Sequence, residues 1–195
     1  MAENEFENES KPTAVETEEK LTAKLRRRRS GNPVQDDVPW AAVARGKPER
    51  LAKALEHARL CARIADDNRA KDVLLLDLRQ VTPLVDFFVI ATADSKRQSN
   101  AIAGEIDQEL KRLGERKLGM EGSEEGRWVL IDYGDFVVHV FSSEARTYYS
   151  LEDIWGDAVR IDWRNPDGDG APPATESGPT TEASPPGDAT STSTS

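Results

Sequence analysis

The sequence contains a single cysteine, Cys61, among 195 residues, and no apolar run approaches the ~20 residues that span a bilayer. One cysteine excludes an internal disulfide and is compatible with a reducing compartment. Cys61 stands beside Leu60 and Ala62 with no histidine next to it, which favours a buried inert thiol over a nucleophile. The N-terminus, MAENEFENES, has the acidic residues that transit peptides avoid. We therefore expect a soluble, cytosolic protein.

The motifs of nucleotide chemistry are also missing. The chain has no P-loop and no dinucleotide-binding glycine fingerprint. It has no D-x-D pair after a Gly-Ser turn, which a metal-dependent nucleotidyl transfer would use to hold two cations. Five aspartates stand at the ends of predicted strands, where capping, turn and ion-pair roles are the better interpretation: Asp72, Asp77, Asp86, Asp132 and Asp135.

The hydrophobic residues are few and unevenly distributed, and their distribution divides the chain into three parts. Only 37% of the residues are hydrophobic and the formal net charge is −10. The large apolar residues are concentrated in 49–163, which is long enough for one domain. We expect 1–48 to be a disordered, charged N-terminal extension, and 164–195 to be a disordered tail rich in Pro, Ser, Thr and Gly.

Four consecutive arginines interrupt the acidic N-terminal extension. On a flexible arm such a run could bind phosphate oxygens, which would give a salt-sensitive contact with RNA or DNA. Pairing with the preceding glutamates, or simple solvation, would explain the run as well. The residues are Arg26, Arg27, Arg28 and Arg29.

Apolar periodicity predicts an α/β domain in the middle of the chain. A helix over 49–66 is expected to bury a stripe of Leu51, Leu55, Ala58 and Ala62. Short apolar runs at 72–78 and 85–93 are typical of buried strands. A helix capped by Asp94 or Ser95 should continue to Leu113 and end at Gly114, with Ile102, Ile106, Leu110 and Leu113 buried.

The second half of the domain predicts more strands and one last helix. A short strand is expected at 117–120, followed by a hairpin of RWVLID and FVVHVF across Tyr133-Gly134-Asp135. Ser142 or Ser143 should cap a helix that continues to about Trp155. Strands and helices alternate before the hairpin, so the fold class is α/β, with a mixed sheet flanked by helices.

His139 raises the question whether the hairpin is catalytic. Asp132 or Asp135 could orient it as a general base, but no Ser or Cys nucleophile has a recognisable setting. Strand alternation places Val137, His139 and Phe141 on one face, which the protein's own helix or another molecule must cover. The opening of the helix at ADSKRQ could similarly seat an anion, although capping explains it equally well.

The charge of 49–163 favours a basic protein partner over a nucleic acid. This part has 16 basic and 22 acidic side chains, so it is net acidic. Nucleic-acid-binding domains are usually basic, whereas an acidic surface is complementary to a basic protein.

Two long blocks resemble the ribosomal silencing factor family, also called RsfS or Iojap-related. DFFVIATADSKRQSNAIAGEI (86–106) is similar to the family's D-Y-F-V-I-A-T-G-x-S-x-R-Q signature. LGMEGSEEGRWVLIDYGDFVVHVFSSEARTYYSLEDIW (118–155) is similar to its longest block, and the resemblance covers about 49–163. Ala93 and Val85 replace the usual Gly and Thr in the first block.

The resemblance implies a nucleotidyltransferase-like fold without catalytic residues, and no cofactor or metal. It also implies binding to the large ribosomal subunit at ribosomal protein L-fourteen, which would block subunit joining and lower translation when nutrients are scarce. The hairpin and the following helix would carry the docking face, with Trp128 as the expected hot spot. Its expected polar and aromatic members are Trp128, Asp132, Asp135, His139, Glu144, Arg146 and Tyr149.

Two alternatives stay open from the sequence. One is a metal-dependent nucleotidyltransferase that uses Ser95 and the strand-end aspartates. The other is a homodimer in the free state, in which Val137, His139 and Phe141 would bury against a second copy.

Overall fold

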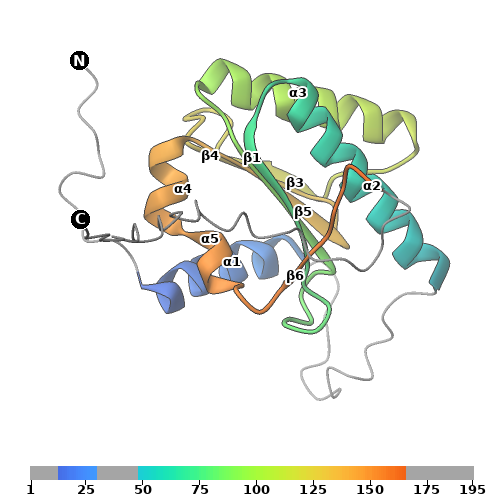
Figure 1. The fold of residues 1–195 in the computed structure, drawn as a ribbon, viewed down its shortest axis with the longest axis horizontal. Helices are drawn as coiled ribbons and strands as arrows, with labels where there is room; N and C mark the ends of the chain where they lie inside the picture. The colour runs from blue at the N-terminus through green and yellow to red at the C-terminus, as the bar shows by residue number, and fades with distance from the viewer. Residues whose placement is uncertain (1–12, 30–47, 166–195) are drawn as a thin grey trace, which may run out of the picture.

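The structure is a computed structural model that describes residues 13–29 and 48–165 (Figure 1). A sheet separates two helical layers. One face is covered by two long helices, α2 (Pro48–Asp67) and α3 (Lys96–Arg112). The other face carries α1 (Ala14–Arg29) and two short helices, α4 (Ser143–Tyr149) and α5 (Leu151–Ile154).

The sheet has six strands in the order β3-β4-β5-β2-β1-β6. Its central pair, β2 and β5, is parallel, and the other neighbours are antiparallel. The predicted mixed α/β sheet is therefore confirmed. The strands are β1 (Lys71–Asp77), β2 (Phe87–Thr92), β3 (Gly119–Glu121), β4 (Trp128–Asp132), β5 (Phe136–Phe141) and β6 (Val159–Arg160).

Strand alternation gives the two faces separate cores. The first core lies between the sheet and α2 and α3, and includes Ala58, Cys61, Val89, Ile106 and Val138. The second core lies on the opposite face, and its members include Leu21, Leu76, Phe88, Trp128, Leu130, Val137, Phe141, Leu151 and Trp155. Cys61 is fully buried and burial raises its pKa, so it is the inert thiol that its apolar neighbours predicted.

Local signals position α3 largely as predicted. Ser95 is its N-cap, with Oγ accepting a hydrogen bond from the Gln98 backbone N–H at 3.2 Å. Gly114 follows the helix with a φ of 83°, a left-handed conformation that glycine adopts without strain. Leu113 is 41% exposed, so its inclusion in the buried stripe was wrong, because it is the C-cap and has left the helical face.

Two element predictions were also wrong. The last helix is not continuous, because Ser150 takes a left-handed conformation (φ 43°) and separates α4 from α5. The N-terminal extension is not disordered over 14–29, where α1 forms and buries Leu21 in the second core. Residues 1–12, 30–47 and 166–195, with the rest of both predicted tails, lie outside the described residues.

Candidate partner-binding surface

The predicted hairpin is present, and its turn is fixed by several polar contacts. Gly134 has a φ of 91°, and its N–H donates to Asp132 Oδ1 at 2.8 Å. Asp135 accepts two hydrogen bonds from Arg50 of α2, from Nε at 2.6 Å and from Nη2 at 2.5 Å. This bidentate pairing raises the pKa of Arg50 and ties the turn to the opposite helical layer.

Trp128 and His139 lie inside the second core. Trp128 is 9% exposed and His139 is fully buried. The Trp128 indole N–H donates to His139 Nδ1 at 3.1 Å, so Nδ1 is an acceptor and the imidazole proton belongs on Nε2. The ring of Phe88 stands edge-on to His139, with 4.6 Å between centroids. The protein's own rings and helices therefore cover the His139 face.

This geometry removes two roles considered for His139. As a general base oriented by Asp132 or Asp135, it would use Nδ1 for the carboxylate, but that nitrogen accepts the Trp128 hydrogen bond. As part of a dimer interface, the face would have to be open, but Val137, His139 and Phe141 are all fully buried within one chain. The buried face of β5 that carries His139 therefore has a structural role within the second core.

Helix α4 lies outside the buried hairpin residues Trp128 and Phe141. Ser142 caps the helix by accepting the Ala145 N–H at 3.2 Å, and Glu144 is exposed in the first turn. Tyr149 is half-buried, and its ring lies over Trp128 with 4.7 Å between centroids. The rigid hairpin therefore holds an exposed carboxylate and a phenol ring at fixed positions on α4.

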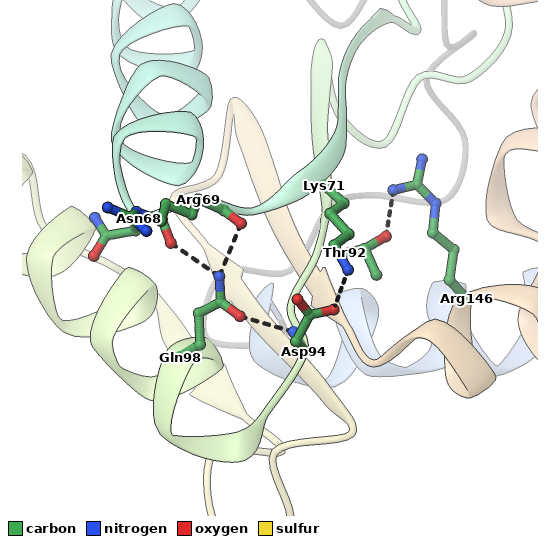
Figure 2. Close-up of polar contacts among 7 residues, drawn as sticks. All are labelled: Asn68, Arg69, Lys71, Thr92, Asp94, Gln98 and Arg146. Atoms are coloured by element: carbon green, nitrogen blue, oxygen red, sulfur yellow. Dashed lines mark hydrogen bonds and ion pairs between the residues drawn. The ribbon is translucent and has the colours of Figure 1, made fainter.

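Arg146 connects α4 to three other elements. Its Nη1 donates to the Asp72 carbonyl and to Thr92 Oγ1, both at 2.7 Å, and its Nε donates to Glu152 Oε1 at 2.8 Å. Figure 2 shows the contact with Thr92 at the end of β2. The side chain is only 11% exposed, so its first role is to hold α4 and α5 against the sheet.

A polar pocket of about 310 Å³ opens beside Arg146, outside the carboxyl ends of the parallel strands. Open α/β sheets place their ligands at this end. Two of its lining residues, Asp72 and Ser150, have left-handed backbones. The lining consists of Asp72, Thr92, Ser143, Arg146, Thr147, Ser150, Glu152 and Asp153.

The start of α3, considered as an anion site, is occupied by the protein's own groups (Figure 2). Gln98 Oε1 accepts the Asp94 N–H at 2.8 Å, while Gln98 Nε2 donates to the carbonyls of Asn68 and Arg69. Asp94 also pairs with Lys71 at 2.8 Å. These contacts join the ends of α2 and β2 to the starts of β1 and α3, which supports the capping interpretation.

The strand-end aspartates make structural contacts too. Asp77 forms an ion pair with Arg79, Asp135 pairs with Arg50, and Asp132 holds the hairpin turn. Within 13–29 and 48–165, no three His, Cys, Asp or Glu residues are grouped to hold a metal. Over the same residues, no helix is both long and apolar enough to cross a membrane.

Comparison with known proteins identifies the family. The model for "Ribosomal silencing factor during starvation" matches residues 51–191, well over half of the chain. The chain belongs to the ribosomal silencing factor family. The resemblance predicted from the two sequence blocks is confirmed.

Individual members of this family support the assignment. The chain is 44% identical over 104 residues to ribosomal silencing factor RsfS of Bacillus subtilis (strain 168), covering 53% of this chain and 88% of that protein. It is 36% identical over 117 residues to the chloroplastic protein Iojap of Arabidopsis thaliana, covering 58% and 46%. The crystal structure of a Chromobacterium violaceum protein superposes with a TM-score of 0.50 at 37% identity, covering 57% of this chain and 88% of that one.

The seven residues predicted for the docking face fall into two groups in the structure. Trp128, Asp132 and His139 are buried beneath the surface, whereas Asp135, Glu144, Arg146 and Tyr149 reach it to differing degrees. Local sequence patterns did not single out Arg50, because it lies 85 positions from its partner Asp135. Thr92 was missed for the same reason, since only the fold brings it to Arg146.

Proposed function

We propose that this chain binds the large ribosomal subunit at ribosomal protein L-fourteen and sterically blocks association with the small subunit. Translation would thereby fall, above all when nutrients are limiting. The observation that carries this proposal is the family match over residues 51–191, whose description names ribosomal silencing during starvation. The mechanism needs no chemical step, because an occupied joining surface removes large subunits from the initiating pool by mass action.

The docking surface in this proposal is the outer side of α4 with the adjoining hairpin turn. Glu144 and Tyr149 would contact the partner directly, and Asp135 would contribute from the turn. Trp128 and His139 would act through position, because Trp128 supports the Tyr149 ring and His139 fixes the Trp128 indole. A rigid aromatic anchor on a packed base is typical of binding hot spots.

Charge supports a basic protein as the partner. The part of the chain from 49 to 163 is net acidic, and Glu144 presents its carboxylate to solvent. Complementary charges raise the association rate and fix the register of docking. They also make the association rate fall as salt screens the attraction.

Co-sedimentation tests the proposal directly. The full chain is mixed with purified large subunits, pelleted, and then challenged with small subunits. We expect the wild type to pellet and to suppress joining, while Glu144→Arg with Tyr149→Ala loses at least ~10-fold in affinity. Glu56→Arg is the matched control, because Glu56 is exposed on α2 in the opposite layer and should bind like the wild type. A wild type that stays in the supernatant with subunits at micromolar concentration would overturn the proposal.

Failure of that experiment would bring forward the enzyme alternative. Calorimetry with ATP and Mg²⁺ would then detect metal-dependent nucleotide binding, which the silencing mechanism does not need.

The arginine run adds a second, separable contact to the proposal. Arg26, Arg27, Arg28 and Arg29 form the last turn of α1, although their side chains lie outside the described residues. We propose that they bind nearby ribosomal RNA. Replacing all four by Gln should flatten the salt dependence of subunit binding, while replacing them by Lys should preserve it. An unchanged slope with Gln would contradict the RNA contact and leave the protein contact intact.

A further inference from the structure

Helix α1 does not belong to the part of the chain that defines the family. It ends at Arg29, whereas the family match begins at residue 51. The alignment with the Bacillus subtilis relative already covers 88% of that protein, which leaves too few residues for a counterpart of α1 and its connection. Helix α1 therefore lies outside the part of this chain that the Bacillus subtilis relative shares.

The added helix nevertheless packs on the domain. Leu21 is 1% exposed and joins the second core, and Thr17 is fully buried. The two are four residues apart and therefore lie on one side of the helix. The element that α1 contacts is α5 (Figure 1), and we call the part of the second core beside α5 that Leu21 joins the α1 seat.

The contact of α1 with its seat leaves part of the helix in water and buries polar atoms without partners. Val15 is 65% exposed, and Glu16, Glu19 and Lys20 face solvent, so this side of the first half of α1 makes no contact with the sheet. Thr17 Oγ1 and Trp155 Nε1 are both buried, and neither has a hydrogen-bond partner among the described residues. Buried polar atoms without partners oppose binding. Because α1 is tethered, an effective concentration on the order of millimolar keeps it bound even where its intrinsic affinity is modest.

Removal of α1 would expose the apolar part of the second core that Leu21 covers, next to α5. Contiguous apolar patches of this kind mark interaction sites in soluble proteins. We propose that the α1 seat is a binding site for an amphipathic helix, and that α1 occupies it as an exchangeable ligand in cis. The ligand is a helix with a leucine and, one turn before it, a small residue on the same face. This inference does not depend on ribosome binding.

A labelled peptide of residues 13–29 tests the proposal on the full-length chain. Leu21→Asp places a charge in the apolar seat and should release α1, so this variant should bind the peptide ~10-fold or more tightly than the wild type, whose seat is filled. The matched control is Val15→Asp, which makes a similar change at an exposed position of the same helix and should behave like the wild type. A peptide carrying Leu21→Asp should bind none of the chains.

Each other outcome overturns the proposal. Equal peptide binding by the wild type and by Leu21→Asp would mean that the peptide binds elsewhere. No binding by a folded Leu21→Asp chain would mean that the seat has no affinity for the helix. If circular dichroism shows that Leu21→Asp and the milder Leu21→Ala both unfold the domain, α1 is an integral part of the fold.

Discussion

The two faces of the sheet are built differently. The face under α2 and α3 is covered by helices of 20 and 17 residues, and its core is rich in alanine and β-branched residues, with aromatic rings at Phe87, Tyr133, Phe136 and Trp163. The opposite face is covered by α1, α4 and α5, of which α4 and α5 have only 7 and 4 residues. Its core holds Trp128, Phe141 and Trp155 and encloses the polar ring of His139.

Under the proposed function, this difference would separate stability from partner binding in the molecule. Long helices bury a large continuous apolar area, which is the main favourable term in folding. Short helices fixed by an arginine and by ring contacts contribute less burial but hold their outer side chains at defined positions. We therefore expect substitutions on the first face to change mainly stability, and substitutions on the second face to change partner binding as well.

The largest effect is expected from Ile106→Ala in the first core. Ile106 is fully buried on α3, and truncation leaves a cavity that costs about 2–5 kcal/mol of unfolding free energy. Urea denaturation measures this loss, and Ile106→Val should cost only about 0.5–1.5 kcal/mol. Loss of subunit binding by folded Ile106→Ala protein would contradict the division between the faces.

Arg146→Met should have the next largest effect, on the second face. It leaves Glu152 partly buried without its ion-pair partner, at a cost of about 2–3 kcal/mol, below the range for fully buried pairs because both side chains are slightly exposed. Glu152→Gln in the same background should recover part of this loss. A double-mutant cycle by thermal or urea unfolding checks the coupling, and strictly additive effects would show that the pair is not coupled.

Two indole substitutions compare the faces directly. Trp128 donates to His139 Nδ1, and Trp163 in the first core donates to the Val73 carbonyl, both at 3.1 Å. Replacing either tryptophan by Phe should cost about 1–2 kcal/mol, because each leaves a buried acceptor without its donor. Only Trp128→Phe should also weaken subunit binding, through the loss of support for Tyr149. Equal binding losses in the two variants would contradict this.

The smallest effect concerns pH and His57 in the first layer. Burial lowers the pKa of His57, against the opposing influence of Glu115. As pH falls through about 6.5, the unfolded state takes up a proton before the folded state does, so stability decreases on acidification. His57→Gln should reduce the loss of unfolding free energy between about pH 7.5 and about pH 5.5. An unchanged pH dependence in this variant would contradict the assignment to His57.

The sequence predicted the fold well wherever local patterns decide it. The Ser95 cap, the Gly114 stop and the alternation of the hairpin all depend on neighbouring residues, and all are present in the structure. No local pattern predicted the helix break at Ser150, because a serine rarely adopts the left-handed conformation that ends α4. β6 was missed because a two-residue edge strand has no periodicity to detect.

Local sequence patterns did not predict which of the proposed docking residues are buried and which are exposed. Trp128 was expected at the surface, and its burial follows from Tyr149 lying over it, a contact across 21 positions that no local pattern records. The burial of Leu21 was not expected either, since most residues of α1 are charged and its two leucines, Leu21 and Leu25, are too few to predict a buried stripe. In both cases a tertiary contact decides what the side chain does.

The part of this chain that matches its relatives and the part that packs into the folded domain begin at different residues. Shared ancestry is recognisable from residue 51 onward, but the packed body includes Thr17 and Leu21, thirty or more positions upstream. A truncation placed by homology would therefore cut away part of the second core and expose the side of the domain beside α5 to water. Such a fragment should keep its fold, lose solubility and associate with other proteins. These properties would result from the truncation and would not be properties of the family.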